Sequence, residues 1–152
     1  MRISARADYA VRATVELAAA PPDRATTAES VAMSQEIPHR FLDSILADLR
    51  RAGLVTSSRG SAGGYRLARP AAEISVADVV RATDGPLVSV RGARPPDLVY
   101  PGAAATLLPV WIALRANVRD VLEHVTLADL VAGDLPARVR ELAEDPGAWQ
   151  NP

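Results

Sequence analysis

The chain of 152 residues contains no cysteine. It therefore forms no disulfides, has no cysteine nucleophile, and offers no thiolate ligands for zinc or an iron–sulfur cluster. Lysine is also absent, because all 17 basic residues are arginine. This absence excludes Schiff-base catalysis by lysine and the phosphate-binding loop that requires a lysine.

Histidine is scarce, and the two that occur, His39 and His124, lie far apart in the sequence. The closely spaced histidines of metal sites are therefore missing, and we expect no metal and no cofactor. No nucleophile can be paired with a base, and no cofactor motif is present. We therefore expect that the protein is not an enzyme.

Long apolar runs are missing as well. The longest uncharged stretch, residues 98–114, contains two prolines and a glycine and is shorter than the span of about 20 residues that a membrane helix needs. Arg2 and Arg6 precede any apolar run, so the N-terminus lacks the pattern of a signal peptide. These features predict a cytoplasmic protein that has no membrane partner.

Positive charge is concentrated in the first half of the chain. Residues 1–69 carry ten arginines against seven acidic residues, whereas residues 70–152 carry seven arginines against eleven acidic residues. Such an asymmetry favours an anionic partner for the first half.

Two helices are predicted before residue 35. Apolar residues recur with helical spacing from Ser4 to Ala19, and prolines follow at once. Thr26 and Glu29 have the spacing of a capping box, which indicates the start of a second, short helix that reaches Met33.

A third helix is expected from Pro38, as its first residue, to Gly53, and its apolar face is formed by Phe41, Leu42, Ile45, Leu46 and Leu49. The opposite face is polar and bears arginines. A short helix, a turn and a longer helix with a polar face are typical of a helix-turn-helix. Residues 54–58 and 65–69 have the pattern of strands, and the glycine-rich residues 59–64 between them predict a hairpin. We therefore predict a mainly α fold with a small β-wing, a winged helix-turn-helix.

Four stretches in order along the chain resemble one known family, and they are residues 4–13, 37–54, 59–67 and 73–85. They resemble the Rrf2 family of bacterial winged-helix regulators, which includes the iron–sulfur cluster regulator IscR, the nitric oxide sensor NsrR and the cysteine-metabolism repressor CymR. The resemblance implies a homodimer that binds double-stranded DNA near promoters and that is most often a repressor. Cluster-sensing members carry three cysteines in the segment that corresponds to residues 87–108, and this chain has none. The resemblance therefore implies a member without a cluster, in which Asp8 and Arg12, one helical turn apart, pair with each other.

Candidate base contacts lie near the start of the third helix, where recognition helices meet base edges, at Arg40, Asp43 and Ser44. Asp43 is informative, because phosphate repels a carboxylate and a cytosine amino group donates to one. Candidate contacts at the hairpin tip are Arg59, Gly60 and Ser61. An arginine there can enter a minor groove. A phosphate-cradling glycine loop is the alternative, and the missing lysine disfavours it.

Further candidate phosphate contacts are His39, Arg2, Ser4, Thr26 and Thr27. All of these except His39 are placed near helix N-termini, whose free amides bind anions. Capping alone would also explain the two threonines, and His39 has the alternative of an ordinary surface residue.

A long helix is predicted from Pro109, with an apolar seam formed by Trp111, Leu114, Val118, Val121 and Val125. Such a seam packs along another helix. The partner helix can belong to the domain's own core or to a second copy, and the resemblance favours a homodimer, because relatives pair through a long helix here. Two short helices are expected at residues 126–133 and 136–143, followed by a frayed tail after Asp145.

The loop of residues 91–102 takes the place of the family's sensing segment. Its charged and aromatic residues form, with the start of the long helix, a possible effector pocket for an anionic small molecule at Arg91, Arg94, Tyr100 and Trp111. A plain connection is the alternative.

The expected organisation is a DNA-binding domain at residues 1–85, a loop at 86–108, dimerisation and short helices at 109–145, and a tail at 146–152. We expect a sequence-specific regulator that binds a palindromic operator as a homodimer without a cluster. A winged-helix module for protein interaction and a regulator that responds to a small molecule near residues 91–111 are the alternatives.

Overall fold

The structure is a computed structural model that describes residues 2–150. Its helices are α1 (Ala5–Ala19), α2 (Ala28–Gln35), α3 (His39–Arg51), α4 (Val76–Asp84), α5 (Leu107–Leu122), α6 (Leu127–Ala132) and α7 (Ala137–Glu144). The two strands are β1 (Val55–Ser58) and β2 (Gly64–Leu67), which pair antiparallel with Val55 opposite Leu67. The short 3-10 helices are Ala71–Glu73, Pro95–Asp97, Gly102–Thr106 and Pro146–Trp149. The predicted mainly α fold with a small β-wing is confirmed.

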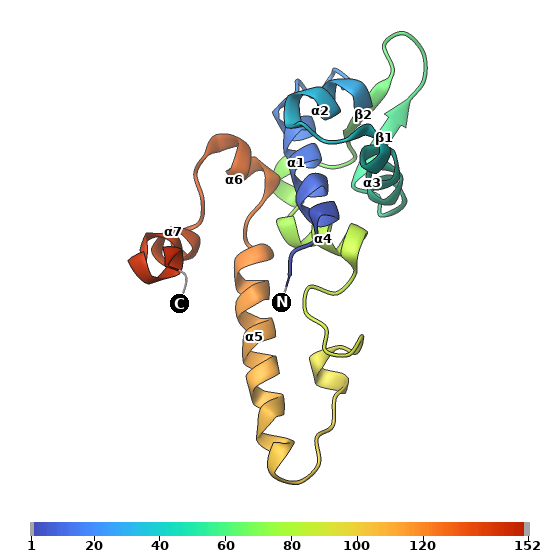
Figure 1. Cartoon of the computed structure of the whole chain (residues 1–152). Helices are drawn as coiled ribbons and strands as arrows, with labels where there is room; N and C mark the ends of the chain where they lie inside the picture. Colours follow the sequence, from blue (N-terminus) through green and yellow to red (C-terminus); the bar gives the residue numbers. More distant parts are fainter. Residues whose placement is uncertain (1, 151–152) are drawn as a thin grey trace.

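The molecule has a compact body and a long arm (Figure 1). Helices α1 to α4, the β1–β2 hairpin and α6 form the compact part, which we call the body. Residues 86–106 run away from it, and α5 returns beside them, so that these two segments form the arm (Figure 1). α7 lies apart from the body, next to the Pro146–Trp149 turn.

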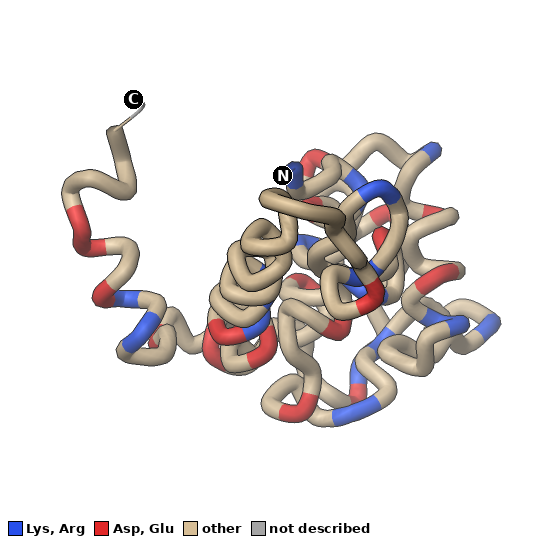
Figure 2. The backbone as a smooth tube through the Cα atoms, turned by 90° about the horizontal axis from the view of Figure 1, so that it is seen from below, with Lys and Arg blue, Asp and Glu red and all other residues tan. Residues whose placement is uncertain are grey.

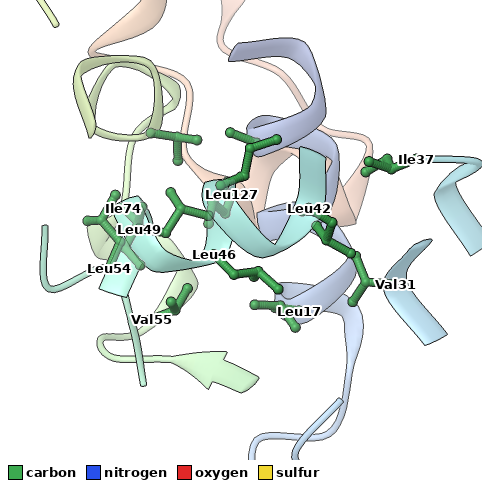
Figure 3. Close-up of a cluster of buried hydrophobic side chains, with 14 of the residues drawn as sticks. Leu17, Val31, Ile37, Leu42, Leu46, Leu49, Leu54, Val55, Ile74 and Leu127 are labelled. Atoms are coloured by element: carbon green, nitrogen blue, oxygen red, sulfur yellow. The ribbon is translucent and has the colours of Figure 1, made fainter. Parts of the chain in front are cut away.

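One hydrophobic core holds the body together (Figure 3). α3 turns Leu42, Ile45, Leu46 and Leu49 inward, and none of these side chains is exposed. They meet residues from every other element of the body, and among these are Leu17, Val31, Ile37, Val55, Ile74 and Leu127. Complete burial of one such aliphatic side chain contributes roughly 1.5–3 kcal/mol, so the core fixes the orientation of α3.

Helix caps explain where several helices begin. The Ser4 hydroxyl accepts the Ala7 amide at 2.9 Å at the start of α1. Thr126 and Asp129 form a reciprocal capping box at α6. The predicted capping box of Thr26 and Glu29 is wrong, because the cap of α2 is the next residue, Thr27. Thr26 is instead held in backbone pairing with β2, which a local pattern cannot reveal.

Three predicted boundaries also differ from the structure. Pro38 precedes α3 instead of starting it. The long helix runs from Leu107 to Leu122, so Val125 does not belong to its seam. Val125 is 5% exposed in the body, where its carbonyl accepts the Val76 amide at 2.9 Å. The expected tail after Asp145 contains a 3-10 turn, which Asp145 caps through the Gly147 amide at 2.8 Å.

No helix within residues 2–150 is both long enough and apolar enough to span a membrane.

Candidate nucleic-acid interface

The turn between α2 and α3 has three residues. Glu36 ends α2 in the left-handed conformation, with φ 52° and ψ 41°. Ile37 is then buried, and its amide donates to the Ala32 carbonyl at 3.0 Å. Pro38, with its fixed φ, starts the chain into α3. The turn therefore anchors one end of α3 in the core and leaves its polar face outside.

The first turns of α3 present three predicted contacts to solvent, which are His39, Arg40 and Asp43. The Arg40 guanidinium lies over the Phe41 ring, 4.9 Å from its centre, so the ring restricts where this cation can point. None of these three side chains makes a hydrogen bond or ion pair with another residue between 2 and 150. They are available to an external partner.

Ser44, the fourth predicted contact on α3, is engaged within the protein. Its hydroxyl donates to the Phe41 carbonyl at 2.9 Å and accepts from Arg6 at 2.8 Å. Arg6 of α1 also pairs with Asp48, to which Arg51 donates at 2.7 Å. The hydrogen bond from Arg6 is the main reason that the pKa of the Asp48 carboxyl lies below its usual value.

Arg6 is a residue that sequence reasoning missed. Its role is to tie the N-terminal end of α1 to the middle of α3, and no sequence pattern connects residues so far apart. Arg50 was missed as well: it donates to the Ser57 hydroxyl at 3.3 Å and joins the end of α3 to β1.

The hairpin of β1, β2 and residues 59–63 forms the wing, which lies next to α3 at the upper right of Figure 1. Arg59, Gly60 and Ser61 are exposed at its tip. Strand β2 of the wing is fixed to the entrance of α2, because the Thr26 amide donates to the Tyr65 carbonyl at 2.9 Å and the Tyr65 amide donates to the Thr26 carbonyl at 2.8 Å. These two hydrogen bonds therefore fix the position of the wing relative to the helix-turn-helix.

The remaining predicted contacts lie elsewhere. Ser4 and Thr27 both cap helices, and the Thr27 hydroxyl accepts the Ser30 amide at 3.1 Å. Arg2 lies near the end of α1 that is remote from the wing, where it lines a groove beside α4 and α5. The expected pair of Asp8 and Arg12 is confirmed at 3.2 Å.

That groove has a volume of about 930 Å³ and lies between the body and the arm. Its apolar walls come from α1, α4, the 86–90 segment and α5, with Val11, Val80, Trp111, Leu114, Val118 and Val121 among the lining residues. No residue of α5 is buried within the protomer. The arm is also free of charge from residue 98 to residue 114, and Figure 2 shows the end of α5 nearest the viewer without any charged residue.

The predicted effector residues do not form a single pocket. Trp111 donates to the Tyr100 hydroxyl at 3.0 Å, and the Arg91 guanidinium lies over the Tyr100 ring, 5.7 Å from its centre. Arg94 instead pairs with Asp97 at 2.9 Å and lines a second cavity, whose wall also includes Leu87 and Val88.

Comparison with known proteins decides the family. The sequence model of Rrf2, described as an iron-dependent transcriptional regulator, matches residues 3–133. The chain belongs to the Rrf2 family. Rv1287 of Mycobacterium tuberculosis, described as an HTH-type transcriptional regulator, is 52% identical over 145 residues, which cover 95% of this chain and 90% of that protein. CymR of Bacillus subtilis, an HTH-type transcriptional regulator, is 31% identical over 132 residues, which cover 87% of this chain and 91% of CymR.

Solved structures of Rrf2 regulators have the same fold. The structure of B. subtilis CymR, called the global cysteine regulator, aligns with a TM-score of 0.75 at 30% identity and covers 88% of this chain and 98% of CymR. The structure of T. potens IscR aligns with a TM-score of 0.72 at 30% identity and covers 88% of each chain. This Rrf2 protein is therefore an HTH-type transcriptional regulator with a winged-helix fold, and not an enzyme.

The iron dependence in the family's description does not fit the donors of this Rrf2 protein. The segment between α4 and α5 has no cysteine, and thiolates are the ligands that hold iron–sulfur clusters. Within residues 2–150, no three His, Asp or Glu side chains lie close enough together to hold a metal ion. The absence of a cofactor remains a prediction, and a direct assay for iron tests it.

Proposed function

We propose that this Rrf2 regulator reads a DNA operator with the start of α3 in the major groove and with the wing beside it. The observations that carry the proposal are an exposed polar face at His39, Arg40 and Asp43 of α3 and an exposed arginine, Arg59, at the tip of the wing, which lies beside α3 (Figure 1). A major groove about 12 Å wide admits one helix. With α3 in that groove, the wing reaches the neighbouring backbone or minor groove, where an arginine is favoured by the negative potential.

The two elements have different tasks in this proposal. Arg59 supplies charge, which attracts any DNA sequence. Asp43 supplies selectivity. Phosphate groups repel its carboxylate on any sequence, and this repulsion is offset only where a cytosine amino group donates a hydrogen bond to it. Arg59→Ala should therefore weaken binding to every duplex, and Asp43→Ala should weaken binding to the operator alone.

Salt titrations of both variants on operator and scrambled duplexes test this division. If each subunit of a dimer loses one phosphate or minor-groove contact, Arg59→Ala reduces the slope of log affinity against log salt by about two. Asp43→Ala keeps the affinity for scrambled DNA and reduces the preference at one symmetric operator position by about 1–3 kcal/mol per base pair. Equal losses of Asp43→Ala on both duplexes would show that this carboxylate does not read a base.

We propose further that the regulator is a homodimer that pairs through α5. Support comes from the apolar groove beside α5 and from the exposure of this helix, in which Val110 and Ile112 are 55% and 39% exposed. A mostly apolar helix without a buried residue gains stability when a second copy covers it. Two-fold symmetry then matches a palindromic operator whose half-sites lie about 34 Å apart.

The double variant Leu114→Asp/Val121→Asp tests the dimer, because it places two charges in the proposed contact. Sedimentation should find monomers, and operator affinity should fall because a monomer holds one half-site at a time. Val131→Asp on α6 is the matched control, since this valine is 45% exposed and does not line the groove. An unchanged dimer of the double variant would mean that the seam packs only within its own chain.

We assign repression as the sign of regulation on the basis of the family resemblance alone. Deletion of the gene should raise transcription from the promoters that the protein occupies, as measured by comparing transcripts with a genomic footprint. A fall in those transcripts would identify an activator.

A further inference from the structure

A cavity of about 290 Å³ lies at the junction between the body and the arm. Four arginines from three separate places in the chain line it: Arg81 of α4, Arg94 before the Pro95–Asp97 turn, and Arg115 and Arg119 of α5. Residues 85–88 complete the wall and contribute Leu87 and Val88 as an apolar side. The cavity therefore combines a basic wall with a small hydrophobic one.

The basic wall is only partly neutralised. Glu123 accepts hydrogen bonds from Arg81 and, at 2.8 Å, from Arg119. Asp97 accepts two from Arg94, at 2.9 and 3.3 Å. Arg115 has no hydrogen bond and no ion pair with any residue in the described part of the chain, although it is half-buried. Three of the four guanidinium groups thus share two carboxylates, and the fourth has none.

An excess of fixed positive charge in a recess is costly for the protein and favourable for an anion. Guanidinium groups are weakly hydrated and present paired N–H donors that match the oxygens of a carboxylate or a phosphate. Because the Arg115 side chain makes no hydrogen bond or ion pair within residues 2–150, its donors are free to bind such a group.

We propose that this cavity binds a small metabolite that bears a carboxylate or phosphate group, with Arg115 as the main contact. The other arginines set the positive potential, and Leu87 and Val88 pack against the carbon part of the ligand. The volume lies just below the range of roughly 300–1,000 Å³ that is usual for ligand pockets, which restricts the occupant to a small molecule. This site is independent of the DNA contacts proposed above.

Because of the position of the cavity, a bound ligand would affect how the arm is held against the body. Glu123 already joins α4 to α5 through its two arginines. An anion that contacts both Arg81 and Arg115 would add a second link across the same junction. Occupancy therefore holds the arm at a fixed angle to the body that carries α3 and the wing.

The test is a titration of the full-length protein, without DNA, with inorganic phosphate and with citrate as probes. Ionic strength is held constant with sodium chloride, and binding is followed by calorimetry. At least one probe should bind saturably, and Arg115→Gln should weaken it by about 10-fold or more, as expected for loss of a hydrogen-bonded charge. Preference for phosphate or for citrate identifies the anionic group.

Two further variants keep the result interpretable. Arg138→Gln on α7 removes an arginine that does not line the cavity, and it should bind the probe as the unmodified protein does. Arg115→Glu introduces a side-chain carboxylate among the remaining arginines. This variant should therefore fold stably, and it should no longer bind the probe. Heat signals that never saturate, or equal affinities for the unmodified protein and both Arg115 variants, would overturn the site. Because DNA is absent, failure here leaves the proposed reading of DNA untouched.

Discussion

Replacement of Gly64 by alanine should detach the wing from the helix-turn-helix. Gly64 has φ 144°, and an added Cβ would lie 2.6 Å from the carbonyl oxygen of Thr26 and 2.7 Å from its carbon. These are backbone atoms, and the two hydrogen bonds between Thr26 and Tyr65 hold them in place. The new methyl group therefore fits only if this bridge opens.

The magnitude follows from two contributions. A strained backbone conformation costs about 1–3 kcal/mol. Loss of two neutral hydrogen bonds costs about 0.5–1.5 kcal/mol each, so the total is about 2–6 kcal/mol. Gly60→Ala is the matched control, because Gly60 also has a positive φ, 98°, and an added Cβ would meet nothing within 4 Å. Gly60→Ala should therefore show only the cost of the strained backbone conformation and no loss of hydrogen bonds.

Urea unfolding and amide hydrogen exchange measure the difference. Gly64→Ala should be less stable than Gly60→Ala by about 1–3 kcal/mol, and the amides of Thr26 and Tyr65 should lose their protection in that variant only. If the wing opens locally, the loss appears in hydrogen exchange and in DNA affinity before it appears in global unfolding. Equal stability and equal protection in the two variants would refute the argument that the bridge fixes the wing.

Three other predictions concern stability and cofactor content. The hydrogen bonds from Arg119 and Arg81 lower the pKa of Glu123 to about 2 from 4.5, so the free energy of unfolding should fall as the pH drops from about 4.5 to 2. Urea unfolding of Glu123→Gln should show a shallower fall over this range, and identical pH profiles of the two proteins would contradict the prediction. Leu46→Ala should reduce the free energy of unfolding by about 2–5 kcal/mol, because Leu46 is completely buried in the core. Met33→Ala should change the melting midpoint little, because Met33 is 73% exposed, and similar midpoints for the two variants would refute this contrast. Protein purified without oxygen should contain no stoichiometric iron or sulfide by chemical assay, and a visible absorption band with both would disprove the prediction.

Local patterns in the sequence were sufficient for the body of the fold. Helical spacing of apolar residues located α1 and α3, because those residues face one core. The glycine-rich hairpin was recognisable because strands and turn are neighbours in sequence. The Asp8–Arg12 pair was predictable for the same reason, since its members are one helical turn apart.

The errors occurred where distant segments meet. Thr26 looked like a helix cap, but Tyr65 pairs with its backbone. Val125 continued an apolar spacing, but the helix ends before it and the chain enters the body. Ser44 looked like a free polar residue of α3, but Arg6 of α1 binds it. In each case the partner lies more than 35 residues away, and neither spacing nor propensity contains that information.

The cavity at the body–arm junction was beyond sequence analysis for the same reason. Arg91, Arg94, Tyr100 and Trp111 are close in sequence, which suggested one pocket, whereas Arg94 faces the arginines of α4 and α5 instead. An apolar seam, by contrast, was visible in α5 because helical periodicity is local. Which surface covers the seam depends on an assembly, and the single chain does not encode that in any short pattern.

The return of the chain from α5 into the body has a consequence for biosynthesis. Leu127 is completely buried in the same core as α1 and α3, and its amide donates to the Ile74 carbonyl at 2.9 Å. The ribosome releases α3 and the wing well before it releases this leucine. The hydrophobic core of the nascent body therefore remains incomplete until most of the polypeptide has been translated. A message truncated after the wing yields a product that lacks this closing piece, so a fragment that ends there cannot complete the hydrophobic core.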